Sequence, residues 1–204
     1  MNPTETPLRW LTPRAWTRQV MEDPLALLND HAHLEKKAAS NALELLHRWP
    51  SGSDGQLAQH WAAVLTGVAR DEVEHLATVT RLLARRGGKL SKTHRNPYAA
   101  QLRGLVRTGR SGELVDRLLV CALIEVRSCE RFELLAEHVD DDELARIYRR
   151  LSVSERGHYA VFVELARRVA PAEQVDSRWE QMLESEAAII VAQPTGPRMH
   201  SGVG

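Results

Sequence analysis

The stretch WAAVLTGVARDEVEHLATVTRL, residues 61–82, decides the fold class of this 204-residue chain. Its apolar residues recur at alternating steps of three and four, as in an amphipathic helix, and not at the step of two typical of a strand. Glu72 and His75 lie on the same seam as Trp61 and Leu82. A carboxylate and an imidazole therefore lie on the face that should enter a core, where an unpaired charge is costly.

Three further segments repeat the helical pattern, and proline and glycine residues mark their ends. We predict long helices over residues 24–49, 55–86, 112–138 and 140–169, and a shorter helix over 172–192 that packs outside them. Segment 87–111 is too long for a hairpin loop and suits a crossover between the second and third helices. The predicted fold is all-α, a ferritin-like four-helix bundle with flanking helices. We expect one domain over residues 1–193 and a flexible tail over 194–204.

The other three long seams also carry a glutamate near their middle, namely Glu35, Glu125 and Glu155. His158 follows Glu155 by three residues, so both lie on one helix face, as Glu72 and His75 do. The four glutamates lie at similar distances from the turns that join the helices, and they should therefore meet at one level. One Glu from each of two helices and one Glu-x-x-His from each of the others is the pattern of di-iron carboxylate proteins.

The predicted metal ligands are Glu35, Glu72, His75, Glu125, Glu155 and His158. Four carboxylates and two imidazoles without a thiolate suit iron or manganese and argue against structural zinc. The alternative is a core with buried Glu/His ion pairs and no metal, but two histidines would then have to satisfy four carboxylates.

Two further residues lie close to the predicted ligands. Asp71 directly precedes Glu72 and is placed to orient His75 or His158 through a hydrogen bond. His31 lies one turn before Glu35, where it is either a hydrogen-bonded core residue, the interpretation we favour, or a seventh ligand.

Composition narrows the class of protein further. The formal net charge is zero, so an anionic partner must be met by a local patch. Cys121 and Cys129 lie about 12 Å apart on one helix and cannot form a disulfide, which favours a reduced, cytoplasmic protein. The longest uncharged apolar run, residues 118–124, is too short to span a membrane, and the N-terminus lacks a secretion signal.

Four local sequences resemble the MiaE-type tRNA hydroxylases. They are DHAHLEKKAA (30–39), RDEVEH (70–75), LIEVRSCERF (123–132) and SERGHY (154–159), and with their spacing the resemblance covers about residues 8–192. It implies an O2-dependent di-iron monooxygenase that hydroxylates the isopentenyl group of 2-methylthio-N6-isopentenyladenosine beside the anticodon of tRNA. It also implies that the six matched positions bind two iron ions, that O2 is a co-substrate and that an external reductase or ferredoxin supplies electrons.

A tRNA substrate requires phosphate contacts, and residues 76–112 contain no acidic residue. The candidate tRNA-binding residues there are Arg81, Arg85, Arg86, Lys89, Lys92, Arg95, Arg103, Arg107 and Arg110. Tyr98 is available for stacking on a base. His33, His94 and His200 match no ligand spacing, and we expect them at the surface or at helix ends.

Two other functions use the same ligands. One is a di-metal peroxidase, ferroxidase or manganese catalase without a tRNA substrate, and the other is an iron-binding or storage protein without turnover. Storage in the manner of ferritin needs a shell of many subunits. For the tRNA hydroxylase we expect a monomer or a small homo-oligomer.

Overall fold

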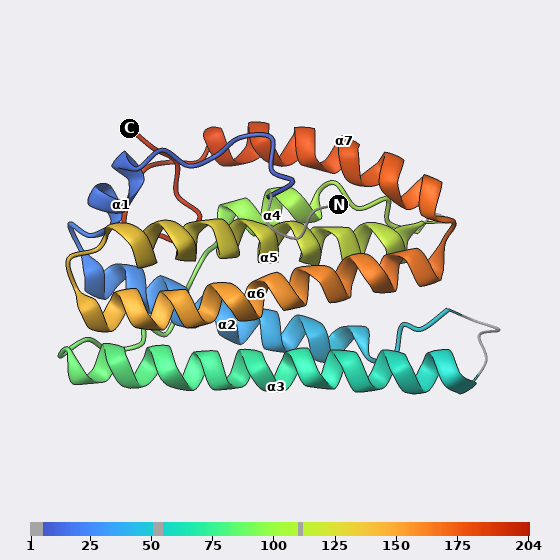
Figure 1. The fold of residues 1–204 in the computed structure, drawn as a ribbon, viewed down its shortest axis with the longest axis horizontal. Helices are drawn as coiled ribbons and strands as arrows, with labels where there is room; N and C mark the ends of the chain where they lie inside the picture. The colour runs from blue at the N-terminus through green and yellow to red at the C-terminus, as the bar shows by residue number, and fades with distance from the viewer. Residues whose placement is uncertain (1–5, 51–54, 110–111) are drawn as a thin grey trace. The chain divides into compact units, whose positions relative to one another are not determined.

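The computed structural model describes residues 6–50, 55–109 and 112–204, which form helices and no strand (Figure 1). The helices are α1 (Ala15–Val20), α2 (Pro24–Leu45), α3 (Gly55–Arg85), α4 (Pro97–Arg103), α5 (Glu113–His138), α6 (Asp142–Val169) and α7 (Ala172–Val191). The five predicted helices are confirmed, whereas α1 and α4 were not predicted. Among the described helices, none has both the length and the apolar character needed to cross a bilayer.

The chain divides into two compact units. The first, Asp23–Arg95, is the α2–α3 unit, in which the two helices pair as antiparallel neighbours (Figure 1). The Asp23 carboxylate accepts a hydrogen bond from the Ala26 N–H at 2.9 Å and starts α2. The helix ends at Leu45, before the predicted Trp49, where the Trp61 indole donates to the Leu45 carbonyl at 2.8 Å. This hydrogen bond satisfies one of the backbone carbonyls that have no partner within the helix at its C-terminal end.

The second unit, residues 1–22 with 96–204, is the α5–α6 unit. Helices α5 and α6 form its antiparallel pair, and α7 runs along α5 (Figure 1). Asp141 caps α6 by accepting hydrogen bonds from the Glu143 and Leu144 amides at 3.0 Å, so α6 begins two residues after the predicted start. Every residue from 125 to 132 of α5 is buried, as expected of a helix that is covered on all sides.

The C-terminal segment, residues 194–204, has defined contacts in this unit, although the sequence predicts a flexible tail there. Met199, His200 and Ser201 are buried. The Arg131 guanidinium donates to the carbonyls of Met199 at 3.3 Å and Ser201 at 3.0 Å, and the Trp16 indole donates to the Ser201 hydroxyl at 3.1 Å. The segment thus supplies hydrogen-bond acceptors to a buried cation of α5.

Candidate metal centre

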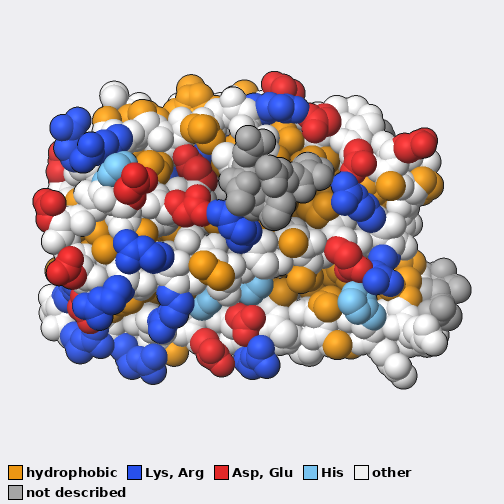
Figure 2. Space-filling view, in the orientation of Figure 1, with side chains coloured by type: hydrophobic (Ala, Val, Ile, Leu, Met, Phe, Trp, Pro, Cys, Tyr) orange, Lys and Arg blue, Asp and Glu red, His pale blue; other side chains and the backbone are white. Residues whose placement is uncertain are grey.

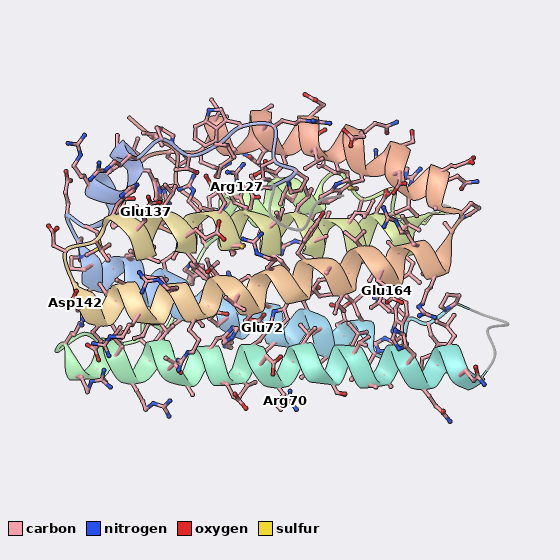
Figure 3. The ribbon with its side chains drawn as sticks, viewed as in Figure 1. Arg70, Glu72, Arg127, Glu137, Asp142 and Glu164 are labelled. Carbon is pink, nitrogen blue, oxygen red and sulfur yellow. The ribbon has the colours of Figure 1, made fainter. Side chains whose placement is uncertain are left out.

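The α2–α3 unit gathers three of the six predicted ligands. Glu35 comes from α2, and Glu72 and His75 come from successive turns of α3. All three are buried, and ligand atoms from each lie within 4.8 Å of one another. The His75 Nδ1 is 3.7 Å from a carboxylate oxygen of Glu35 and 3.7 Å from one of Glu72. Figure 3 labels Glu72 and the exposed Arg70, which project from different sides of α3.

The α5–α6 unit gathers the other three in the same arrangement. Glu125 comes from α5, and Glu155 and His158 come from successive turns of α6. These residues are also buried and also offer ligand atoms within 4.8 Å of one another. The His158 Nδ1 lies 3.7 Å from a Glu155 oxygen and 4.0 Å from a Glu125 oxygen. Each unit therefore carries one half-site of two carboxylates and one imidazole.

The chemistry of each half-site fits a divalent metal. Oxygen and nitrogen ligands bind at roughly 2.0–2.2 Å, so two ligands of one cation lie about 3–4 Å apart, whereas an N–H···O hydrogen bond is shorter, about 2.7–3.2 Å. The separations of 3.7 and 4.0 Å match the first spacing. Carboxylate and imidazole without thiolate is a donor set that iron and manganese accept. The described residues thus fit the metal that the sequence pattern predicts.

A histidine supports one ligand directly. The His31 Nε2 contacts the Glu35 Oε1 within α2, and the His31 side chain is almost fully buried. Glu35 therefore has an imidazole partner, consistent with the favoured interpretation of His31 as a hydrogen-bonded core residue. Asp71 pairs with Arg70 at 3.0 Å and its side chain is 35% exposed. Its predicted action on His75 or His158 stays a prediction.

Behind Glu125, α5 carries buried charges that form a closed network. Arg127 donates two hydrogen bonds to the Glu186 carboxylate, at 2.8 and 2.9 Å, and one to Glu130 at 3.0 Å. The Tyr98 hydroxyl donates to Glu186 at 2.9 Å, and Glu130 also accepts from the Thr12 amide at 2.6 Å. Burial disfavours the charged guanidinium, but these carboxylates outweigh burial and raise the pKa of Arg127. Figure 3 shows Arg127 on the side of α5 that faces α7.

Sequence reasoning missed most of this network. Within α5, Glu130 pairs with Arg127 at 3.0 Å and with Arg131 at 3.7 Å. Tyr98 was expected to be available to a base, which is wrong, because it is fully buried and bound to Glu186. Arg127 and Glu186 are 59 residues apart in the sequence, so no local pattern indicates that they pair.

Three histidines also lie where the sequence did not predict them. His200 is buried, packs against Tyr98 with ring centroids 4.5 Å apart and the rings tilted by 31°, and lies 3.3 Å from the Ser128 hydroxyl. His33 and His94 have largely buried side chains and stack in parallel, 4.7 Å apart. Their contacts with distant segments explain their burial, and such contacts leave no local sequence pattern.

The candidate tRNA-binding residues fall into three groups. The exposed ones are Arg81, Arg85, Lys89, Lys92, Arg95 and Arg103, and Arg86 is half-buried. In Figure 2, Lys and Arg side chains gather over the C-terminal end of α3, at lower left. Arg107 is also exposed, but its guanidinium donates to Asp116 at 2.7 Å, a hydrogen bond that raises the pKa of Arg107, and it shares that carboxylate with Arg178. Arg110 lies outside the described residues.

Comparisons with known proteins agree along nearly the whole chain. The family described as tRNA-(MS[2]IO[6]A)-hydroxylase (MiaE) matches residues 1–201. The tRNA 2-(methylsulfanyl)-N(6)-isopentenyladenosine(37) hydroxylase of Pseudomonas putida is 37% identical over 192 residues, which cover 94% of this chain and 90% of that protein. The enzyme of the same name from Salmonella typhimurium is 31% identical, with 94% of this chain and 86% of that protein covered.

A solved structure gives the fold comparison. It is titled "Protein 43 with aldehyde deformylating oxygenase activity from Synechococcus", has a TM-score of 0.86 and 33% sequence identity, and the match covers 96% of each chain. The predicted fold class, all-α and ferritin-like, is confirmed.

Proposed function

Since this chain belongs to the MiaE family of tRNA hydroxylases, we propose that it hydroxylates the isopentenyl group of 2-(methylsulfanyl)-N6-isopentenyladenosine beside the anticodon of tRNA. One observation of the structure carries the proposal: two like half-sites, each with two buried carboxylates and one imidazole, occupy the matched positions. A tRNA substrate places the reaction in the cytoplasm.

The proposed ligands of two iron ions are Glu35, Glu72, His75, Glu125, Glu155 and His158. When bound, an iron pair with O2 supplies the oxidising power that insertion of oxygen into a C–H bond requires. Four carboxylates carry four negative charges, which balance two divalent cations and leave the imidazoles as neutral ligands. This balance removes the cost of burying the glutamates without partners.

The neighbouring residues position the ligands and the substrate. His31 holds the Glu35 carboxylate in one orientation, as partners of metal ligands commonly do. The apolar residues of each seam, such as Leu65 and Val79 on α3 and Phe162 on α6, are buried and keep water away from the reacting carbon. We also propose that the small side chain of Ala38, about one turn after Glu35 on α2, makes room for the prenyl tail. We also assign Asp71 a role in orienting a histidine ligand.

Electrons and tRNA must reach the protein from outside. Hydroxylation reduces the second oxygen atom of O2 to water, which consumes two electrons and two protons. We propose that a reductase or ferredoxin delivers the electrons to a monomer or small homo-oligomer. The proposed phosphate contacts are the exposed basic residues Arg81, Arg85, Lys89, Lys92, Arg95 and Arg103, together with half-buried Arg86.

The test is nucleoside mass spectrometry. Isopentenylated bacterial tRNA is incubated with iron-loaded protein, a reductant and isotopically labelled O2. We expect one labelled oxygen on the methylthio-isopentenyladenosine nucleoside, and none when the protein carries His158→Ala. Rapid O2 or peroxide consumption without any labelled nucleoside would favour the oxidase or peroxidase alternative and overturn the proposal.

A further inference from the structure

A cluster of polar side chains lies on the side of α2 opposite to Glu35. At 100° per residue, Asp30, His33 and Lys37 form one stripe that faces away from the Glu35 seam. This stripe holds the segment that follows α3. The Ser91 amide donates to the Asn29 side chain at 2.7 Å, and the His33 Nε2 lies 3.0 Å from the Ser91 carbonyl.

The centre of the cluster is a chain of three groups. The His94 Nε2 is 2.6 Å from an Asp30 carboxylate oxygen, and the His94 Nδ1 is 2.8 Å from the Lys37 ammonium nitrogen. A carboxylate only accepts and an ammonium only donates, so the geometry requires Nε2–H on His94 and a lone pair on its Nδ1. His33 stacks on the same ring with an angle of 3° between the planes. Asp30 thus sets the tautomer of His94, and His94 fixes the ammonium of Lys37.

This arrangement is unusual for an exposed lysine. Lys37 is exposed, whereas the side chains of Asp30 and His94 that hold it are only 8% and 7% exposed. Lysine loses much rotamer freedom when it binds a ligand, so a lysine that is already held loses less. One of the three N–H donors of the ammonium points to His94.

We propose that Lys37, held by His94 and Asp30, is a preorganised contact for a backbone phosphate of the RNA substrate. Further exposed basic residues lie near the cluster in the sequence of the same unit: Lys36 beside Lys37 on α2, and Lys89, Lys92 and Arg95 on the segment that carries His94. The inference rests on the proposed function for the identity of the RNA. It adds a residue of α2 to the candidate tRNA-binding residues named above, which run from Arg81 to Arg110.

The position of Lys37 also indicates which part of the RNA it meets. A helix with its side chains is about 10–12 Å across, so Lys37 lies roughly that far from the Glu35 side of α2. A base held at Glu35 cannot itself touch Lys37. The contact is therefore with the backbone of flanking nucleotides, which contributes affinity and orientation without reading sequence.

The test measures binding of a fluorescent isopentenylated anticodon stem–loop by anisotropy across a series of salt concentrations. Lys37→Gln is compared with Lys36→Gln, a matched control that removes the same charge from the neighbouring exposed residue. We expect Lys37→Gln to weaken binding about threefold to tenfold at 0.1 M salt and to lower the slope of log K against log salt by about 1. Lys36→Gln should have less than half of that effect on log K.

A third variant separates charge from preorganisation. His94→Phe keeps a ring for His33 to stack on but removes both hydrogen bonds, so it should weaken binding about threefold with an unchanged salt slope. Equal effects of Lys37→Gln and Lys36→Gln, or no effect of either, overturn the inference. Hydroxylation of the same RNA by the unchanged protein is measured in parallel. If product forms but RNA binding does not depend on Lys37, the lysine contact is rejected and the proposed function stands. If RNA binding depends on Lys37 but no product forms, the proposed function is rejected and the lysine contact stands.

Discussion

The α2–α3 unit and the α5–α6 unit carry the same three ligand types, but different neighbours support them. In the α2–α3 unit, the glutamate of the first helix has a histidine one turn earlier, since His31 contacts Glu35. In the α5–α6 unit the corresponding residue is Cys121, whose thiol donates to the Arg117 carbonyl. Behind Glu125 lies the buried network of Arg127, and behind Glu35 lies the polar stripe of Lys37.

This difference separates two tasks of the proposed enzyme. A metal ligand must be held in place, and a macromolecular substrate must be reached from the surface. The α5–α6 unit holds its half-site by surrounding α5 with α7 and the C-terminal segment. The α2–α3 unit holds its own half-site by a direct hydrogen bond and leaves the opposite side of α2 partly exposed.

The largest expected effect tests whether the two half-sites are equivalent. His75→Ala and His158→Ala each remove one imidazole, and we expect each to reduce hydroxylation at least about 100-fold, in line with the loss of a group on which metal binding depends. Iron per chain, measured by mass spectrometry of the metal, should fall in both variants. Full iron and activity in either one would remove that histidine from the ligand set.

The next effect is on the free energy of unfolding, and it tests the buried network of Arg127 behind Glu125. Arg127→Met leaves the carboxylates of Glu186 and Glu130 buried without their cation, which should lower the free energy of unfolding by about 3–5 kcal/mol. Arg70→Met on α3 is the control, because Arg70 is 71% exposed and should change stability by less than about 0.5 kcal/mol. Urea unfolding measures both. Adding Glu186→Leu to Arg127→Met should restore part of the loss, and a further decrease would argue against an unpaired carboxylate as the cause.

A smaller effect sharpens the comparison between His31 and Cys121. His31→Ala removes the partner of Glu35 and should weaken iron binding about 10–100-fold. Cys121→Ala, at the corresponding position before Glu125, should leave the affinity within about threefold. Titration of metal-free protein with ferrous iron under anaerobic conditions gives both values. Equal affinities of the two variants would show that the histidine does not support the ligand.

The smallest effect is on the stability of the folded protein at low pH. Burial alone would raise the pKa of Asp116 at the start of α5, but hydrogen bonds from Arg107 and Arg178 outweigh it, and the pKa is lowered. A carboxylate with a lowered pKa in the folded protein stabilises it above the pKa of the unfolded chain, about 3.9, and this contribution is lost as the pH falls through the folded value. Asp116→Asn should therefore destabilise the protein at pH 7 by about 1–3 kcal/mol and show a smaller loss of stability on acidification below pH 4.

Thermal unfolding across pH 3–7 tests this last expectation. Asp176→Asn is the control, because Asp176 pairs with Arg167 at the surface, where its side chain is 53% exposed and an ion pair contributes little. Parallel pH profiles for Asp116→Asn and the unchanged protein would contradict the assignment.

Local patterns predicted the long helices and the buried positions of the six candidate ligands, because both depend on spacing within one helix. Metal binding by these six residues stays a prediction. The seam through Trp61, Glu72 and His75 marks the buried face of α3, and the turn at Gly87 follows its C-terminal end. The residues Asn96 and Pro97, a side-chain cap followed by a first-turn proline, could have revealed α4 as well.

Contacts between distant segments were not predictable in this way. The pairs Arg127–Glu186 and Tyr98–Glu186 join different helices, and nothing local distinguishes Glu186 from the exposed glutamates of α7. The same holds for His94, which reaches Asp30 and Lys37 across the loop after α3. A polar residue that is buried by long-range pairing looks in sequence like a surface residue.

The order of the two units along the chain has a consequence for synthesis on the ribosome. The α2–α3 unit is one continuous stretch that is complete once Arg95 has emerged, whereas the other unit joins the first residues to the last. Arg131 receives its acceptors at Met199 and Ser201 only after residue 201 has been made. At about 5–20 residues per second, the stretch from Arg95 to Ser201 takes on the order of ten seconds to make. During that interval Glu35, Glu72 and His75 are the ligands that a newly made chain can already offer to a metal.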